Sequence, residues 1–282
     1  MHLVKTIKEM HAWSRQARLE GGSIGFVPTM GALHEGHLSL VRRSKDENDN
    51  TVVSIYVNPA QFGPHEDLDK YPRDIEADLA KLSPYTVDVV FLPANQEMYP
   101  DDFSLSIEVG AQGDLLCGAS RPGHFNGVAL VVTKLFNIVV PHRVYFGQKD
   151  FQQTVIIRKL VMELNFDIDI MVCPIVRESD GLAMSSRNVY LDEKERKAAP
   201  VLYESLKLGE KLIASGSMTE SSSVKNEISR MITSEPFAAL DYVTIVDIHT
   251  LEEVTTIKLP VAICIAATIG NTRLIDNVIV EG

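Results

Sequence analysis

The chain has 282 residues, 45% of them hydrophobic, which allows one large or two ordinary domains with a substantial core. Its formal net charge of -11 argues against a general nucleic-acid or membrane surface, because phosphate backbones and anionic headgroups attract basic proteins. Any anionic substrate must therefore meet a local cationic pocket.

The sequence predicts alternating helices and strands up to residue 175. A first helix is expected over residues 7–19. Strands are then expected over residues 24–29, 52–57, 87–92, 144–147 and 168–172, and helices over 38–45, 72–82, 128–139 and 151–164. Because these strands are almost entirely apolar, the pattern predicts an α/β domain whose parallel sheet is covered by helices on both faces.

The pattern changes after residue 174. A loop over residues 177–191 leads into helical stretches and then into strands that alternate or run apolar. The expected helices cover 193–213 and 221–232, and the expected strands cover 242–247, 261–267 and 274–280. We therefore predict a smaller α+β domain over residues 176–282, after a first domain over residues 1–175.

The cysteines and the N-terminal segment bear on the cellular compartment. Cys117, Cys173 and Cys264 are odd in number, lie far apart and form no CxxC pair, so neither a disulfide framework nor a zinc ribbon is expected. Residues 1–20 carry charges throughout, and no run of about 18 apolar residues occurs. We expect a cytoplasmic protein without a signal peptide or membrane span.

Three polar segments follow predicted strands. They are PTMGALHEGH (28–37), NPAQFG (58–63) and GQKDFQQ (147–153). Ligands of parallel α/β sheets bind beyond the carboxyl ends of the strands. We therefore expect all three segments at one edge of the sheet, where their polar groups converge as an active site requires.

The segment PTMGALHEGH has the pattern of a strand, a tight turn and a helix start. Gly31 and Gly36 allow close approach of the backbone to a ligand, and the N–H groups at a helix start favour an anion. His34 and His37, one helical turn apart, are placed to donate to one oxyanion, for which phosphate is the candidate.

A zinc site is not supported, because HEGH lacks the HExxH spacing and an obvious third ligand. GALHEG (31–36) and GASRPG (118–123) have the GxxxxG spacing of a phosphate-binding loop, but neither is followed by Lys-Ser or Lys-Thr, so a Walker nucleotide site is not supported either.

Further candidates lie at a strand-to-helix junction and in two loops. Lys149 could neutralise a phosphate or be an ordinary exposed lysine, and Asp150 could bind a ribose hydroxyl or cap a helix. Two serine hydroxyls beside a guanidinium can hold phosphate oxygens, or they can belong to an ordinary turn. This set is Ser185, Ser186 and Arg187.

Other candidates lie in loops that contain Pro and Gly, namely Asn58, Gln61, Arg121 and His124. An acidic cluster at Glu66, Asp67 and Asp69 is interpreted as a solvated loop, with a magnesium contact as the alternative.

Six segments that span nearly the whole chain follow one another in a characteristic order. They are PTMGALHEGH, NPAQFG with EDLDKYPRD, GASRPGHFNGV, YFGQKDFQQ, DGLAMSSRN and GNTRLIDN. Together they resemble the pantothenate synthetase (pantoate:beta-alanine ligase) family. HEGH also resembles the HIGH signature of the nucleotidylyltransferase superfamily, and MSSRN resembles its KMSKS counterpart.

The resemblance implies a Rossmann-like N-terminal domain, a smaller C-terminal lid, a homodimer and Mg²⁺-dependent use of ATP as a substrate. It implies a catalytic set of His34, His37, Lys149, Ser185, Ser186 and Arg187. It implies ATP contacts from these residues and from Met30, Gly147, Asp150, Val176 and Met184. It implies pantoate contacts from Met30, Asn58, Gln61, Arg121, His124 and Gln153. The metal ligands stay unknown.

The family reaction passes through pantoyl adenylate, and it needs alignment and charge neutralisation more than a protein nucleophile. Two other hypotheses stay open at this point. One is an adenylyltransferase that joins AMP to a mononucleotide. Accumulation of a dinucleotide instead of AMP would support this hypothesis. The other is a nucleotide sensor without turnover, which pantoate-dependent release of pyrophosphate would exclude.

Overall fold

The computed structural model describes residues 1–64 and 66–282. Its contacts divide the chain into two compact units. The first unit comprises Met1–Gly113, Arg121–Gly147 and Ile156–Pro174, and the second comprises Asp114–Ser120, Gln148–Val155 and Ile175–Gly282. Two short segments that precede residue 175 thus belong to the second unit by contact. The boundary between domains at residues 175 and 176 stays a prediction.

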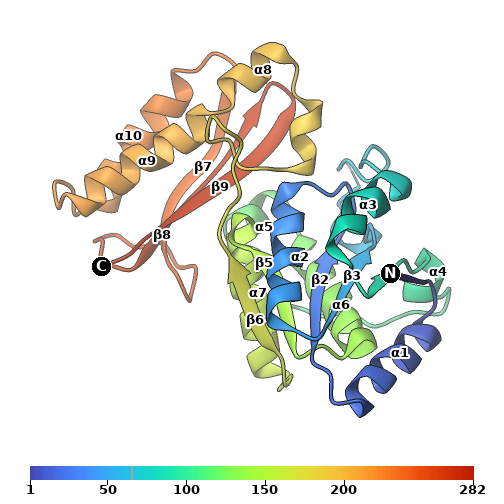
Figure 1. Ribbon diagram of the computed structural model, residues 1–282. Helices are drawn as coiled ribbons and strands as arrows, with labels where there is room; N and C mark the ends of the chain where they lie inside the picture. The colour runs from blue at the N-terminus through green and yellow to red at the C-terminus, as the bar shows by residue number, and fades with distance from the viewer. Residues whose placement is uncertain (65) are drawn as a thin grey trace. The chain divides into compact units, whose positions relative to one another are not determined.

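The first unit is built on a six-stranded sheet with the strand order β1-β4-β3-β2-β5-β6, and all neighbours in it pair in parallel (Figure 1). The predicted mixed α/β fold with a parallel sheet is confirmed. The strands are β1 (His2–Val4), β2 (Ile24–Thr29), β3 (Asn50–Ile55), β4 (Val89–Phe91), β5 (Arg143–Gly147) and β6 (Asp169–Cys173).

Successive residues of the strands alternate between two apolar layers, because side chains of a strand point to opposite faces in turn. Phe26 and its neighbour Val27, both 0% exposed, belong to different core clusters. Residues of α1 and α6 complete the first cluster, and residues of α2 complete the second. The helices of this unit are α1 (Ile7–Leu19), α2 (Glu35–Glu47), α3 (Ile75–Leu82), α4 (Asn95–Met98), α6 (His124–Val139) and, from Ile156 onward, α7 (Phe151–Glu163).

Several element bounds differ from those expected, for local physical reasons. α6 begins at His124 instead of residue 128, so the prediction that His124 lies in a loop is wrong. Gly127 lies inside α6, at a place where the helix packs against the backbone of Ala60 and a side chain would not fit. α3 begins at Ile75 instead of residue 72, because Asp74 caps it by accepting a hydrogen bond from the N–H of Ala77.

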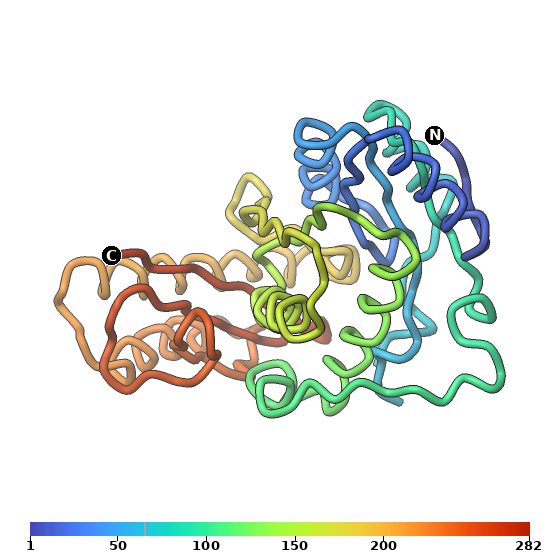
Figure 2. Tube along the Cα trace, turned by 90° about the horizontal axis from the view of Figure 1, so that it is seen from below, coloured from blue at the N-terminus to red at the C-terminus, as the bar shows by residue number. Residues whose placement is uncertain are grey.

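The second unit contains a three-stranded antiparallel sheet with the order β7-β8-β9 (Figure 1). Helices α9 and α10 pack on one face of it, drawn in orange beside the red strands in Figure 2. The single helical stretch predicted over residues 193–213 is instead two helices, because Pro200 has no N–H with which to continue the helical ladder. The elements are α5 (Cys117–Ser120), α8 (Glu193–Ala198), α9 (Val201–Ala214), α10 (Ser221–Thr233), β7 (Ala238–Asp247), β8 (Val261–Ile269) and β9 (Thr272–Val280).

Alternate residues of β8 face two different layers. Ile263 and Ile265 belong to the core with α9 and α10, whereas Ala262 and Cys264 pack with Phe151 at the start of α7. The sheet of the second unit is therefore apolar on both faces. Within the described residues, no helix has the length and apolar character needed to cross a bilayer. All three cysteines are buried and carry free thiols.

Candidate functional site

The carboxyl ends of the strands place two of the three polar segments at one edge of the first unit's sheet. β2 ends at Thr29 and β3 ends at Ile55, and the two strands pair in parallel. The segments that follow them therefore leave the sheet at the same edge, as predicted. β5 pairs with β2 on the other side and ends at this edge with Gly147.

A buried carboxylate holds the turn between β2 and α2. Gly31 and Ala32 have left-handed backbone angles, with φ of 81° and 50°. The carboxylate of Asp78 on α3 accepts hydrogen bonds from the N–H groups of Ala32 at 2.9 Å and Leu33 at 2.7 Å. Burial raises the pKa of Asp78 although these bonds lower it. The sequence analysis did not identify Asp78 as a site residue. The feature that could have indicated it is an acidic residue among the apolar positions of a predicted helix.

His34 and His37 cap the start of α2 with their imidazole rings. Nδ1 of His34 accepts a hydrogen bond from the N–H of Gly36 at 3.1 Å, and Nδ1 of His37 accepts from the N–H of His34 at 3.3 Å. The ring centroids lie 4.1 Å apart. A ring nitrogen that accepts a hydrogen bond carries no hydrogen, so each neutral ring carries its hydrogen on Nε2. The backbone of the helix start thereby selects the same tautomer for both histidines.

This arrangement favours an anionic ligand. The N–H groups of the first turn of α2 and the helix dipole provide partial positive charge without an ionised side chain. The Nε2–H groups of the two imidazoles add donors of the kind that bind phosphate oxygens. The phosphate site predicted for residues 31–37 stays a prediction, for which these groups supply suitable donors.

Asn58 and Gln61 form a buried amide pair after β3. Nδ2 of Asn58 donates to Oε1 of Gln61 at 3.0 Å and to the carbonyl of Gly127 at 3.1 Å. Oδ1 of Asn58 accepts from the hydroxyl of Tyr99 at 2.8 Å, and Nε2 of Gln61 donates to the sulfur of Met30 at 3.1 Å. Because Asn58 is 1% exposed and bonded at both polar atoms, we infer that it acts by orienting Gln61.

Gly127 allows α6 to approach this amide pair closely. A Cβ at Gly127 would lie 2.1 Å from the carbonyl oxygen of Ala60 and 2.7 Å from Cα of Gln61. We expect Gly127→Ala to lower the free energy of unfolding by about 1–3 kcal/mol and to raise the KM for the ligand of Gln61, because the backbone around Ala60 must move. Urea denaturation and steady-state kinetics measure the two effects.

Gly63→Ala is the matched control for that substitution, because the nearest atoms to its Cβ among the described residues would be those of Glu66, at 3.7 Å or more. We expect this variant to unfold within about 0.5 kcal/mol of the unsubstituted chain. Equal stability of the Gly127 and Gly63 variants would contradict the close approach of α6 to the backbone of Ala60.

Arg121 forms a two-point ion pair with Glu66. Nε and Nη2 of Arg121 donate to the two carboxylate oxygens of Glu66 at 2.7 and 2.6 Å. Burial raises the pKa of Glu66, but the hydrogen bonds and charge of Arg121, a backbone bond at Gly63 and the charge of His124 together outweigh burial and hold this pKa below its ordinary value. The interpretation of Glu66 as a solvated acidic residue is therefore wrong. Its carboxylate instead neutralises Arg121.

The ion pair continues to Gln61 through a histidine. Arg121 Nη1 donates to Nε2 of His124 at 3.1 Å, because a guanidinium has no acceptor. Nδ1 of His124 then donates to the carbonyl oxygen of Gln61 at 2.8 Å. The two residues are thus joined to the backbone of the predicted pantoate contact Gln61.

The second unit holds the other predicted site residues. Lys149 and Asp150 lie in the 3-10 turn η4 (Gln148–Asp150) before α7, where Nζ of Lys149 is 3.6 Å from Oδ1 of Asp150. Gln152 is buried and donates to the carbonyl of Leu115 at 2.7 Å, whereas Gln153 is only partly buried. Of the two neighbouring glutamines on α7, Gln153 is the one with exposed surface for a ligand.

The predicted phosphate-binding loop is closed at its base by backbone bonds. The N–H of Met184 donates to the carbonyl of Val176 at 3.0 Å. Ser185 caps the 3-10 helix η5 (Ser186–Tyr190), because its Oγ accepts a hydrogen bond from the N–H of Arg187 at 3.3 Å. These contacts bring Val176 and Met184 together directly beside the Ser185 turn.

The predicted site residues thus fall into two groups, one in each unit. The first unit holds Met30, His34, His37, Asn58, Gln61, Arg121, His124 and Gly147, and the second holds Lys149, Asp150, Gln153, Val176, Met184, Ser185, Ser186 and Arg187. Among residues 1–64 and 66–282, no group of three or more His, Cys, Asp or Glu side chains is arranged to hold a metal ion.

Comparison with known proteins gives full-length matches. The family model described as pantoate-beta-alanine ligase matches residues 2–279. Pantothenate synthetase of Caldicellulosiruptor bescii is 52% identical over 281 residues, covering 100% of this chain and 99% of that protein. Pantothenate synthetase of Thermotoga petrophila is 54% identical over 279 residues, covering 99% of each chain.

Solved structures match over the same length. The crystal structure of pantothenate synthetase from Thermus thermophilus has a TM-score of 0.94 and 42% identity, covering 100% of both chains. The pantoate-beta-alanine ligase of Francisella tularensis, complexed with beta-gamma ATP and beta-alanine, has a TM-score of 0.82 and 37% identity, covering 100% of this chain and 98% of that one.

Proposed function

The chain belongs to the pantoate-beta-alanine ligase family, and from this premise we propose that it joins pantoate to beta-alanine, consuming ATP and releasing AMP and pyrophosphate. The observation that carries the proposal is the match to the family over residues 2–279. The ATP and beta-alanine complex of the Francisella tularensis relative supports the choice of substrates.

The proposed reaction has two steps. In the first, a carboxylate oxygen of pantoate attacks the α-phosphorus of ATP, the bond to the β-phosphate breaks, and pyrophosphate leaves with the electron pair. In the second, the amine nitrogen of beta-alanine attacks the acyl carbon of pantoyl adenylate. The bond between the acyl carbon and the phosphate oxygen then breaks, AMP leaves, and the nitrogen loses a proton.

Each group of site residues has a part in the first step. We propose that His34 and His37 donate from Nε2 to phosphate oxygens, and that the remaining phosphate contacts come from Lys149, Ser185, Ser186 and Arg187. Oriented donors and cations of this kind stabilise the charge that develops on a leaving pyrophosphate. The adenosine would be bound by Met30, Gly147, Asp150, Val176 and Met184.

Pantoate would be bound by Gln61, Gln153 and Met30, with Asn58, Arg121 and His124 around the same pocket. Because Glu66 neutralises Arg121, we propose that this guanidinium supports the pocket through His124 and Gln61 and does not supply net charge to the substrate. Donors from the amides then fix the orientation of the attacking carboxylate.

We further propose that Mg²⁺ accompanies ATP and takes most of its ligands from phosphate oxygens and water, which requires no cage of protein carboxylates. When bound, the ion would offset phosphate charge. The family resemblance also supports a homodimer and a cytoplasmic location as proposals. Three buried free thiols agree with a reducing compartment.

Measurement of pyrophosphate and AMP with and without each substrate tests the proposal. We expect pyrophosphate release from ATP to require pantoate, and AMP and pantothenate to accumulate only when beta-alanine is added. A dinucleotide product formed with a mononucleotide substrate would instead identify a different adenylyltransferase. ATP binding without pyrophosphate release under any of these conditions would indicate a sensor.

A further inference from the structure

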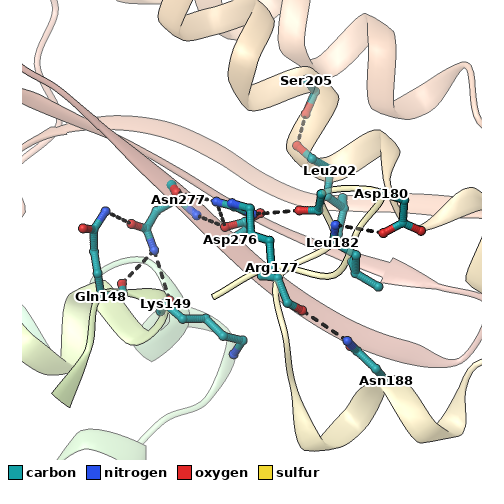
Figure 3. A network of polar contacts seen from close by, with 12 residues as sticks. Gln148, Lys149, Arg177, Asp180, Leu182, Asn188, Leu202, Ser205, Asp276 and Asn277 are labelled. Atoms are coloured by element: carbon teal, nitrogen blue, oxygen red, sulfur yellow. Dashed lines mark hydrogen bonds and ion pairs between the residues drawn. The ribbon is translucent and has the colours of Figure 1, made fainter. Parts of the chain in front are cut away.

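Two consecutive residues of β9, Asp276 and Asn277, are buried polar side chains on opposite faces of the second unit's sheet (Figure 3). They are 3% and 2% exposed. In the register of β9 with β8, Asp276 lies opposite Ile265 and Asn277 lies opposite Cys264. Ile265 and Cys264 face different core layers. Buried polar groups are costly unless bonded, so what each side chain contacts is informative.

Asn277 binds the backbone of the turn that carries Lys149. Its Nδ2 donates to the carbonyl oxygens of Gln148 and Lys149, at 3.0 Å in both cases. Its Oδ1 accepts from Nε2 of Gln148 at 3.2 Å. Figure 3 shows the amide of Asn277 directed at both residues of the turn. A turn of three residues has little regular structure of its own, so this amide fixes the backbone from which the lysine side chain extends.

Asp276 binds the first residue of the loop that leads to Ser185. Its carboxylate accepts from Nη1 of Arg177 at 2.6 Å and from Nη2 at 3.0 Å. Arg177 also donates to the carbonyl of Gly181 at 3.1 Å and lies 3.7 Å from the ring centre of Tyr203. A guanidinium held at two carboxylate oxygens and against a ring has a single defined orientation.

We propose that Asp276 and Asn277 are positioning residues, which set Lys149 and the 184–187 segment at a fixed separation along one rigid strand so that both meet the same triphosphate. The inference rests on the proposed function, since it assigns the triphosphate as the shared ligand. β9 pairs with β8 over its whole length, from Thr272 to Val280, which gives the strand the rigidity this role needs.

Asn277→Asp tests the first contact, because it keeps the shape and replaces the donor with an anionic oxygen facing two carbonyl oxygens. We expect the rate of pantoate-dependent pyrophosphate formation to fall by about tenfold to a hundredfold, since small displacements of a positioned group are costly. The reaction of supplied pantoyl adenylate with beta-alanine should change little, because no triphosphate takes part in it. A purely structural defect would slow both half-reactions alike, and that result would overturn the proposal.

A double-mutant cycle asks whether Asn277 acts through Lys149. In a Lys149→Ala background, Asn277→Asp should cost no more than about threefold in pyrophosphate formation, because the group it positions is already gone. Independent, multiplicative losses would overturn the assignment. If the aspartate variant does not fold, Asn277→Ala removes the same donors without adding charge and is measured in the same cycle.

The contact between Asp276 and Arg177 is tested by a second double-mutant cycle. It combines Arg177→Lys, which loses the two-point pairing with Asp276, with Arg187→Ala.

Asn137→Asp is the matched control for Asn277→Asp, since Asn137 is exposed and its amide donates to the backbone carbonyl of Thr133 at 2.8 Å. It should leave both half-reactions unchanged. No pyrophosphate from the unsubstituted chain would refute the proposed function, whereas normal pyrophosphate from the Asn277 variants would refute only the positioning role.

Discussion

Replacing Lys149 with alanine is expected to reduce pantoate-dependent pyrophosphate formation by on the order of a hundredfold or more while leaving the fold intact. The ammonium group extends from a turn whose backbone is held by Asn277, so its removal should not disturb the turn. The attack of the pantoate carboxylate on ATP joins two anions, so it requires cations near the leaving pyrophosphate. Lys149 is one of the cations that we propose for this place. The measurement is the single-turnover rate of pyrophosphate release at saturating ATP and pantoate.

Lys159→Ala is the matched control, since Lys159 lies further along the same chain segment, on α7, and pairs with Glu163 at the surface. It should retain normal turnover, because an exposed ion pair contributes little. Thermal unfolding of both variants should remain close to that of the unsubstituted chain. Near-normal pyrophosphate formation by the Lys149 variant would remove this residue from the triphosphate site.

Replacing His34 with asparagine is expected to preserve the start of α2 and still lower pyrophosphate formation by on the order of a hundredfold. His34 does two things at once, since its Nδ1 caps the helix and the capping bond leaves the hydrogen on Nε2. Asparagine is among the best helix caps but has no group in the place of the imidazole Nε2–H. The substitution therefore separates capping from phosphate contact, which alanine cannot do.

The comparison variant His34→Ala should lose the cap as well, at a cost of about 0.5–2 kcal/mol in the free energy of unfolding. Urea denaturation measures that difference, and pyrophosphate release measures the chemistry. Asp192→Asn, a substitution of the same kind at the cap of α8, should leave both quantities unchanged. An asparagine variant at His34 with normal turnover would show that the imidazole serves only to begin the helix.

Much of the fold followed from local pattern. The apolar runs around Phe26, Val53 and Val144 predicted strands, and their alternation with helices predicted the parallel sheet that the structure contains. Local chemistry also placed the turn before His34 correctly. Errors arose where one residue overrode a pattern, as when Pro200 divided a predicted helix in two.

The candidate site was predictable in its residue types but not in its supporting contacts. His34 and Lys149 could be chosen because they stand in polar segments next to strand ends. Neither Asp78 nor Asn277 could be chosen in that way, because one lies within a helix and the other within an apolar strand. Each acts on a segment far away in the chain, at separations of 46 residues for the bond to Ala32 and 128 for the bond to Lys149.

By itself, the sequence determined the family, the α/β class and the side chains available for phosphate chemistry, because periodicity and motif order are properties of neighbouring residues. Only the tertiary structure decided which buried polar groups hold those side chains in place and which carboxylate neutralises Arg121. The physical reason is that a buried charge or amide is satisfied by whichever partner strand register and helix packing bring within about 3 Å. A linear pattern does not contain that information.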